Sequence, residues 1–547
     1  MVEKTRSSLW DTKVDRRQVL KTGAAGGLAV LAAGCVPGAA PAGQPMDDAP
    51  AVVSKKTSLT MGIGGDVPGM NVLERAVAPA TSVYYAMWDT GMEAQFNADG
   101  SRQGLKPMLI TDYRVLDDQT TWEFKLREGI SFNNGEPWDA EAAAWNIEYR
   151  LTGETSRTSF RSLLISKYEG VEVVDKYTIN VKTNVPFAFT PLIMMYLQVA
   201  PPAYYQDVGI EGFGENPVGL GPYRFVEWRK GQHIVLERNP DYWGEQATID
   251  ELIFKPFSED ATRVAALQAN EIDMAYNVPP DDAQRLTEAG LQISWIPIGQ
   301  AMNLTMKTGS NPGHPLESPI NDKLVRQAMN YALDKDSLVN DIMGGYAAPL
   351  DGQIVGPSCF GYNPNLEAYP YDPDKAMELL AEAGYPDGFT MDFDSAQGRY
   401  SKQKEVSEWM VGEYAKVGIN LEMQLFEWSA FIDKVYSDQS APVFYTGRNW
   451  YPTMDPENTL KMYECSERRA QVCEDELETM LFAQRAEFDQ AKRETILHDI
   501  HTWLHDYCPV VYLFEAPDIF GHSAKVKNFV PTPDNRVHLI GMTVEES

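Results

Sequence analysis

The sequence predicts a mixed α/β protein of more than one domain. The chain has 547 residues, which is more than one hydrophobic core usually supports, and 44% of them are hydrophobic. Segments with the two-residue alternation of strands follow segments with helix-start and helix-stop residues along the whole body. The body contains neither an internal repeat nor a low-complexity segment, so we expect several compact α/β units.

The first half of the body alternates strand and helix signals. In 121–127 apolar side chains alternate with polar ones, which predicts a half-buried strand. The stretch 139–153 predicts a helix that begins after Asp139, a good N-cap residue. Residues 223–239 predict two strands that meet at a turn near Lys230–Gly231.

The second half begins with a helix predicted over 258–270 and capped by Ser258, followed by a strand over 271–278. The stretch 321–345 is strongly helical and ends on two glycines. The stretch 372–384 predicts a helix with an aspartate cap, a proline at its first position and a glycine at its stop.

The N-terminal stretch Asp15–Cys35 reads as an export signal. Arg16–Arg17 resemble a twin-arginine signal, and the short apolar run after them is too short to span a bilayer. Its end, "LAAGC", resembles a bacterial lipoprotein box, in which Cys35 becomes the lipidated first residue of the mature chain. An ordinary cleaved signal is the alternative. We therefore assign 1–35 as the signal and 36–56, rich in Ala, Gly and Pro, as a flexible tether.

Charge and motifs narrow the functional classes. A formal net charge of −31 repels phosphate backbones, so we expect no nucleic-acid partner. The sequence has no GxSxG, HExxH or P-loop motif, so we expect that the protein is not an enzyme and uses no cofactor. A secreted hydrolase is the rival functional class.

Besides Cys35 the chain has four cysteines, an even number that suits an oxidising compartment. Cys465 and Cys473 are eight positions apart and would close a small loop. Cys359 and Cys508 would then form the long-range pair, although three pairings are possible in principle. A metal site is the weaker interpretation, because no second CxxC or CxxH accompanies these residues.

Seven stretches, in order, resemble the extracellular solute-binding proteins of family 5, the peptide and nickel type that serves ATP-binding-cassette importers. The resemblance covers roughly residues 57 to 530. It rests on "TTWEFKLREGISFNNGEPWDAEAAAWNIEY", "NPVGLGPYRFVEW…LERNPDYWG", "RVAALQANEIDMA", "VRQAMNYALDKDSLVNDIMGGYAAP", "YDPDKAMELLAEAGYPDGF", "VGINLEMQLFEWSAF" and "MDPENTL".

The family implies a periplasmic-binding-protein-like fold, with two lobes around a cleft and an extra domain inserted in the first lobe. The expected boundaries are 51–92, 214–303 and 512–547 for lobe I, 93–213 for the inserted domain II and 304–511 for lobe III. The two crossings would lie near 302–307 and 508–514. The family also implies a monomer outside the cell, held here by a lipid anchor, that closes on its ligand and hands it to a membrane permease.

The resemblance also implies site residues. In dipeptide-binding relatives the position of Arg399 carries an arginine that holds the ligand carboxylate, chemistry that suits a guanidinium group. The family's pocket-lining segment matches 445–456. The other candidates are the neighbour of that arginine, four residues of this segment, one residue of the glycine-rich loop 62–71 and two residues of the first crossing, namely Tyr400, Arg448, Asn449, Trp450, Tyr451, Asp66, Met302 and Asn303.

One position departs from the family pattern. The relatives carry an aspartate for the peptide's amine three positions before the "DP" aspartate, and this chain has Pro452 there. A buried ammonium would lack its partner, which favours a modified peptide or another organic solute over a simple dipeptide. Core packing is the alternative for Trp450, and an ion pair within the protein is the alternative for Arg399.

Three further hypotheses stay open. His498, His501 and His505 share one face of a predicted helix and would suit a metal, with a solvated or half-buried face as the alternative. The protein would otherwise be a binding-only receptor for a metal chelate or a sugar. A sensor that presents its closed form to a membrane receptor is the third, and the sequence does not separate it from an importer subunit.

Overall fold

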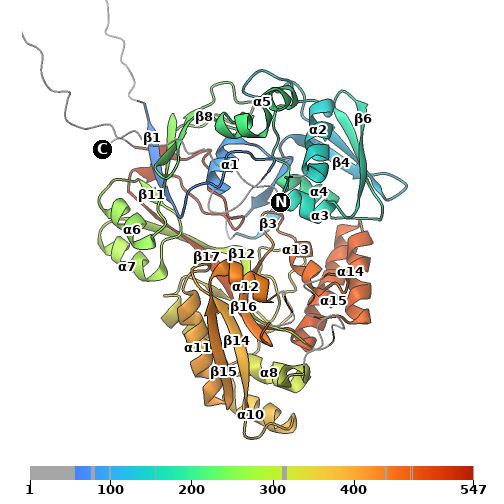
Figure 1. The fold of residues 1–547 in the computed structure, drawn as a ribbon, viewed down its shortest axis with the longest axis vertical. Coiled ribbons are helices and arrows are strands. Elements are labelled where there is room, and N and C mark those ends of the chain that lie inside the picture. The colour runs from blue at the N-terminus through green and yellow to red at the C-terminus, as the bar shows by residue number, and fades with distance from the viewer. Residues whose placement is uncertain are drawn as a thin grey trace, which may run out of the picture. The chain divides into compact units, whose positions relative to one another are not determined.

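The computed structural model describes residues 56–545 except 75–80, 98–99, 154, 309, 311–316, 436, 438–439, 468–469 and 471. These residues belong to one compact unit that begins at Lys56 (Figure 1). The proposed twin-arginine pair, Cys35 and the tether up to residue 55 lie outside the described residues. No helix within the described ranges combines the length and the apolar character needed to cross a bilayer.

An eleven-stranded mixed sheet forms the centre of the fold. Its strand order is β15-β14-β16-β12-β17-β11-β1-β10-β9-β8, with β13 paired to β17. The strands are β1 (Ser58–Ile63), β8 (Tyr223–Arg229), β9 (His233–Arg238), β10 (Glu251–Pro256), β11 (Met274–Ala275), β12 (Gln292–Met306), β13 (Ala348–Pro349), β14 (Phe389–Ala396), β15 (Ile419–Phe426), β16 (Val443–Asn449) and β17 (Val510–His522). Strands from both ends of the chain therefore share one sheet.

Three smaller sheets complete the strands. A four-stranded antiparallel sheet has the order β4-β5-β7-β6, and two pairs are β2-β3 and β18-β19. Their bounds are β2 (Met92–Phe96), β3 (Arg102–Pro107), β4 (Ile110–Val115), β5 (Thr121–Leu126), β6 (Tyr168–Asp175), β7 (Thr178–Thr183), β18 (Val526–Lys527) and β19 (Thr543–Val544).

The helices range from single turns to the 18 residues of α15, and several of them begin at a side-chain cap. They are α1 (Thr81–Met87), α2 (Ala140–Thr152), α3 (Ser159–Leu164), α4 (Thr190–Ile193), η1 (Met194–Tyr196), α5 (Pro202–Glu215), α6 (Asp260–Gln268), α7 (Pro280–Glu288), η2 (Pro319–Asn321), α8 (Lys323–Tyr331), α9 (Lys335–Ser337), η3 (Leu338–Ile342), α10 (Pro373–Glu382), α11 (Gln403–Lys416), α12 (Trp428–Val435), α13 (Glu457–Leu460), η4 (Lys461–Tyr463), α14 (Asp475–Ala486) and α15 (Gln490–Tyr507).

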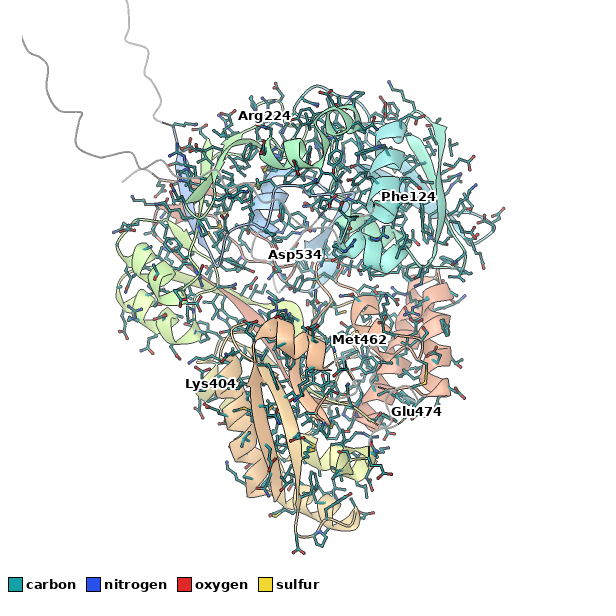
Figure 2. All side chains as sticks on the ribbon, viewed as in Figure 1. Phe124, Arg224, Lys404, Met462, Glu474 and Asp534 are labelled. Atoms are coloured by element: carbon teal, nitrogen blue, oxygen red, sulfur yellow. A yellow bond between two sulfur atoms is a disulfide. The ribbon has the colours of Figure 1, made fainter. Side chains whose placement is uncertain are left out.

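The strand and helix predicted in the first half form one side of a hydrophobic core. The apolar face of β5 is buried, and Phe124 lies in the four-stranded sheet against which α2 packs (Figure 2). Asp139 caps α2 by accepting a hydrogen bond from the backbone N–H of Ala142 at 3.1 Å, as the sequence predicts. The turn between β8 and β9 contains Gly231, whose φ of 72° suits glycine.

Two predicted helices differ from the structure. The N-cap of α6 is Glu259, one residue after the predicted Ser258, and it makes no side-chain capping bond. The helix predicted over 321–345 is interrupted after Tyr331, because the Asp334 side chain accepts a hydrogen bond from the backbone N–H of Ser337 and starts a new helical turn. The predicted strand over 271–278 is reduced to the two residues of β11.

The two longest strands, β12 and β17, run antiparallel through the middle of the central sheet (Figure 1). Their ladder is interrupted between Pro297 and Ala301, so that residues 298–300 lie opposite Ala516 alone. At this interruption Gly299 donates its N–H to the carbonyl oxygen of Pro533. These two strands contain most of the segments predicted as crossings, whereas the lobe boundaries themselves stay a prediction.

The four cysteines of the described residues form one disulfide. Cys465 and Cys473 are bonded, which confirms the short loop predicted from their spacing. The predicted pair of Cys359 with Cys508 is wrong, because both residues have free, buried thiols. Cys508 is instead within hydrogen-bonding distance of the hydroxyl of Tyr369, at 2.9 Å.

The buried carboxyl group of Asp89 is expected to make the free energy of unfolding depend on pH. Burial and repulsion from Glu93 raise the pKa of Asp89 to about 8, although Trp243 and Tyr242 donate hydrogen bonds to it. The folded state therefore favours the protonated acid, and this stabilisation is complete below pH 4 and is lost as pH rises towards 8. Relative to the Asp89→Asn variant, the wild type is expected to lose up to about 1.4 kcal/mol per pH unit in this window. Urea unfolding of both proteins at pH 4, 6 and 8 measures the difference, and a constant difference contradicts the assignment.

Candidate ligand-binding site

A cavity of about 780 Å³ lies where several predicted parts of the chain meet. This volume is within the usual range of small-molecule sites. Residues of α1, α2, α3 and the C-terminal segment form part of its wall, and residues 399–458 form much of the rest. The wall thus draws on the predicted lobe I, on the predicted insertion and on the predicted lobe III.

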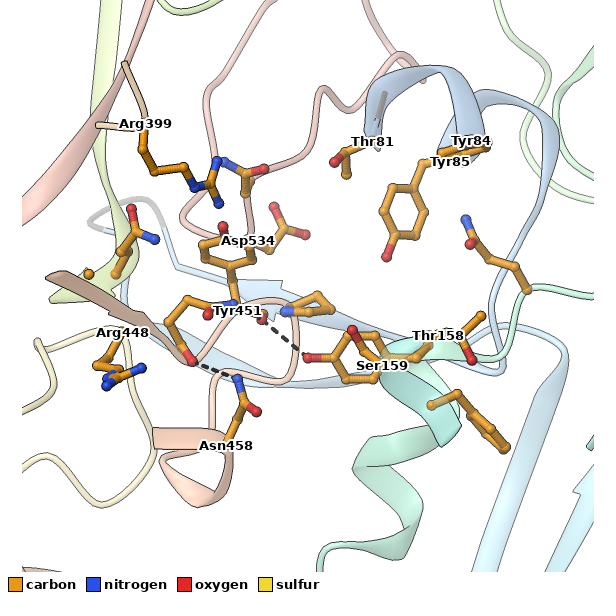
Figure 3. Close-up of a pocket in the computed structure, with 18 of the residues that line it drawn as sticks. Thr81, Tyr84, Tyr85, Thr158, Ser159, Arg399, Arg448, Tyr451, Asn458 and Asp534 are labelled. Atoms are coloured by element: carbon orange, nitrogen blue, oxygen red, sulfur yellow. Dashed lines mark hydrogen bonds between the residues drawn. The ribbon is translucent and has the colours of Figure 1, made fainter. Parts of the chain in front are cut away.

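Two arginines stand on one side of the cavity, as Figure 3 shows. Arg399 follows β14, and its guanidinium carbon lies 5.3 Å from the centre of the Trp428 ring and 5.5 Å from that of Tyr400. Arg448 comes from β16, and its Nη2 is buried without a hydrogen-bond partner. Among the described residues neither arginine forms an ion pair, so both positive charges remain available to a ligand.

The stretch 449–458 contains both residues that line the cavity and residues that anchor the stretch in the protein. Tyr451 lines the cavity, and its carbonyl oxygen accepts a hydrogen bond from the hydroxyl of Tyr196 at 3.3 Å (Figure 3). Asn449 also lines it, and its carbonyl oxygen accepts a hydrogen bond from Nδ2 of Asn458 at 3.1 Å. Asp455 faces away into the protein, where it is fully buried against Arg493.

The wall also contains polar groups from the predicted insertion. Arg150 of α2, Gln198 after η1, and Thr158 and Ser159 at the start of α3 all line the cavity. Arg150 and Gln198 are buried, at 1% and 3% exposure, although both reach this surface. Sequence reasoning singled out neither of them, because nothing local marks a residue of an amphipathic helix as part of a distant pocket.

Asp534 is the acidic residue of the wall, and the sequence analysis missed it too. Burial by itself would raise its pKa, but His538 and Arg536 attract the charged form and lower the pKa of Asp534 to about 2. Its carboxylate contacts Nε2 of His538 at 3.2 Å and accepts a hydrogen bond from the Thr532 hydroxyl at 2.7 Å. The cavity therefore contains one ionised carboxylate near its centre (Figure 3).

The structure brings five of the predicted site residues together and leaves four outside. The five in the wall are Arg399, Tyr400, Arg448, Asn449 and Tyr451.

Trp450 is fully buried in a hydrophobic core, where its Nε1 donates to the hydroxyl of Ser358 at 3.2 Å, so its side chain does not line the cavity. Asp66 lies elsewhere and accepts hydrogen bonds from Trp228 and from the backbone of Gly231.

The two residues predicted at the first crossing do not reach the cavity either. Met302 and Asn303 are each 1% exposed within β12, between β16 and β17. Met302 packs in a second hydrophobic core, and the Asn303 side chain donates to the carbonyl oxygen of Ala301. A central strand buries both of its faces, which is why these residues support the wall without forming it.

The three histidines of α15 do not gather around a common point. Nε2 of His498 contacts the carbonyl oxygen of Tyr362, and Nε2 of His505 contacts that of Glu367. His501 is fully buried, and burial lowers its pKa to about 3. Within the described ranges no group of three or more His, Cys, Asp or Glu side chains is placed to hold a metal ion.

Comparison with known proteins identifies the family. The sequence profile of the bacterial extracellular solute-binding proteins, family 5 Middle, matches residues 104–470, which is more than half of the chain. The chain belongs to family 5 of the extracellular solute-binding proteins. Proteins of this family bind small ligands and deliver them to permeases of ATP-binding-cassette transporters, and the homologues are binding proteins rather than enzymes.

Curated relatives within family 5 include the glutathione-binding protein GsiB of Pectobacterium atrosepticum. It is 28% identical over 452 residues, which are 78% of this chain and 83% of that protein. GsiB of Escherichia coli O157:H7 is 31% identical over 355 residues, or 63% of this chain and 66% of that protein.

Solved structures show the same fold. NikA from Brucella suis in complex with Fe(III)-EDTA has a TM-score of 0.78 at 21% identity, covering 89% of this chain and all of that one. The periplasmic binding protein DppA from Helicobacter pylori in complex with the peptide STSA has a TM-score of 0.73 at 22% identity, covering 89% and 98%. The predicted periplasmic-binding-protein-like α/β fold is thereby confirmed.

Proposed function

We propose that this protein captures a small peptide, a modified peptide or a related organic solute that carries a carboxylate, and delivers it to a membrane permease of an importer. We further propose that the chain is exported as a monomer and anchored outside the cell through a lipid on Cys35. A receptor of this kind would close around the ligand when contacts from both sides of the cavity favour the closed state.

One observation carries the proposal: Arg399 and Arg448 face the cavity and form no ion pair among the described residues. A guanidinium group stays charged when enclosed and binds carboxylates through two parallel hydrogen bonds. The whole protein is strongly acidic, so positive side chains without acidic partners are unusual and suit a carboxylate ligand. Tyr400 and Trp428 next to Arg399 provide aromatic faces for the apolar part of such a ligand.

Asp534 supports a ligand that also bears an amine. It stands in the wall as an ionised carboxylate, although Pro452 replaces the aspartate expected from the dipeptide-binding relatives. An ammonium group would therefore meet an acidic wall residue at a different position, one that His538 and Arg536 already contact. The names of the curated relatives make glutathione, which has two carboxylates and one ammonium group, the first ligand to test.

Arg399→Ala is expected to weaken binding of glutathione, or of the ligand retained by the protein, by about 1.5–3 kcal/mol, because a charged hydrogen-bonded pair is lost. Isothermal titration calorimetry measures the change. Arg285→Ala is the matched control, because Arg285 pairs with Asp282 on the surface helix α7. An unchanged affinity in Arg399→Ala would remove this arginine from the proposed site.

Native mass spectrometry of the mature chain, as purified and after mild denaturation, tests the ligand class directly. A retained peptide or amino-acid conjugate supports the proposal. A retained sugar or metal chelate would instead favour the alternative receptors. Association with permease subunits in detergent would separate an importer subunit from a sensor.

A further inference from the structure

Arg150 is buried at the cavity wall without a carboxylate partner among the described residues. Its Nε donates to the backbone carbonyl oxygen of Gln198 at 3.0 Å, and its Nη2 donates to the same oxygen. A carbonyl dipole satisfies these hydrogen bonds but does not neutralise the charge. Burial therefore lowers the pKa of Arg150 to about 9, which still leaves it charged at neutral pH.

Gln198 adds a second unsatisfied donor to the same region. Its side-chain Nε2 is buried and has no acceptor in the described part of the chain, and the residue lines the cavity next to Arg150. A buried amide N–H without an acceptor costs roughly 1–3 kcal/mol, so such a group in a native protein calls for an explanation, and a bound ligand is one. Because the amide donates and the arginine is positive, an anion would satisfy both groups.

The charges of the wall agree with this assignment. Three arginines line the cavity against one aspartate, a formal excess of two positive charges in a protein whose net charge is −31. The aspartate, Asp534, is already compensated by His538 and Arg536. Arg399 and Arg448 stand on the same side of the cavity, one above the other, whereas Thr158 and Ser159 stand on the other side (Figure 3). Arg150 comes from α2, which contacts α3, the helix that begins at Ser159.

We infer that Arg150 and Gln198 form a second anion subsite, and that the natural ligand carries two carboxylates bound at opposite walls of the cavity. This inference rests on the proposed capture of a carboxylate-bearing solute and specifies its class. One carboxylate binds Arg399 and Arg448, and the other binds Arg150 and Gln198. A ligand with a single carboxylate leaves one pole of the cavity unpaired and binds more weakly.

The test compares glutathione with two analogues that each lack one carboxylate. One is γ-glutamylcysteinylglycinamide, and the other is 4-aminobutyrylcysteinylglycine, which lacks the glutamyl carboxylate. The wild type is expected to bind glutathione about 10- to 100-fold more tightly than either analogue, because each analogue loses a charged hydrogen-bonded pair. Calorimetry with Arg150→Gln and Arg399→Ala then assigns each carboxylate to its arginine.

In Arg150→Gln the affinity for glutathione is expected to fall about 10- to 100-fold relative to the wild type. The analogue that lacks the carboxylate bound by Arg150 is expected to bind this variant as tightly as it binds the wild type. The other analogue behaves in this way with Arg399→Ala. Arg114→Gln is the matched control, because Arg114 lies on the exposed strand β4 and pairs with Glu123. Gln198→Glu, which is nearly isosteric, is expected to reduce glutathione affinity without lowering the melting temperature, and it tests the subsite if Arg150→Gln fails to fold.

Several results would overturn the inference. Arg150→Gln and Gln198→Glu variants that bind glutathione like the wild type would show that this region contacts no anion. Equal affinity of the wild type for glutathione and both analogues would show the same. Absence of glutathione binding to the wild type would also overturn it, and a monocarboxylate found by native mass spectrometry would in that case leave the capture function standing.

Discussion

Replacing Asp455 with alanine is expected to lower the free energy of unfolding by about 3–5 kcal/mol. Asp455 and Arg493 form a two-pronged ion pair, with Nη1–Oδ2 at 2.5 Å and Nη2–Oδ1 at 2.9 Å. Both side chains are buried, and Arg493 is further held by Gln484. Removing the carboxylate leaves the guanidinium charge of Arg493 buried without its partner, and this unpaired charge accounts for most of the expected loss of stability. Urea unfolding followed by circular dichroism measures it.

The matched control is Asp282→Ala on the surface helix α7. Asp282 pairs with Arg285, whose side chain is 52% exposed, and surface pairs of this kind contribute at most about 1 kcal/mol. Because Asp455 anchors a segment in which several other residues line the cavity, its loss is also expected to weaken ligand binding. An Asp455→Ala protein as stable as the control would show that the pair contributes little to the fold.

Trp450→Ala is expected to destabilise the protein by a similar amount, about 3–5 kcal/mol, because it empties a large buried site. The indole packs in the core, and the residue's backbone N–H donates to the carbonyl oxygen of Gly299 at 2.8 Å. A Cβ added to Gly299 would lie 2.9 Å from the indole Nε1, so the contact is already close. Thermal and urea unfolding measure the change in stability.

Trp450→Phe is the graded comparison, because it keeps an aromatic ring in the core and loses the hydrogen bond to Ser358. It is expected to cost less than the alanine variant. The alanine variant should also bind glutathione more weakly, since Arg448 and Tyr451 flank Trp450 in the chain and both line the cavity. A fully stable Trp450→Ala protein would contradict its role as an anchor.

Local signals predicted much of the fold. The alternation in β5, the Asp139 cap of α2 and the proline and glycine around α10 all depend on residues a few positions apart, and the structure shows each of them. Competition between neighbours was harder to predict. Asp334 interrupts a helix that composition favours, because its side chain caps a new turn instead of pointing to solvent.

The site was only partly predictable, because its wall is assembled from distant segments. The positions of Arg399 and of the stretch around Arg448 in the wall were predicted from the family resemblance. Trp450 belongs to the same stretch, and the sequence does not distinguish an aromatic residue that contacts a ligand from one that is buried in the core, as Trp450 is. Arg150 and Asp534 reach the cavity from segments far apart in the chain, and only the tertiary fold brings them together. Arg150 stands out because it lacks a carboxylate partner among the described residues, and Asp534 because His538 and Arg536 compensate its charge. Neither property can be read from the sequence.

The interruption between β12 and β17 is the place where the proposed closure would bend the central sheet. Pro297 and Pro517 face each other without N–H groups, and in this ladder residues 298–300 have only Ala516 opposite them, so a bend here would break no hydrogen bond between the two prolines. In the proposed closure the rungs on both sides stay intact. Amide hydrogen exchange at Ser294 and Leu304 would then report global unfolding, while the opening that admits a ligand leaves these amides protected. Fast opening of the cavity would then be compatible with a stable fold, because opening and global unfolding would break different hydrogen bonds.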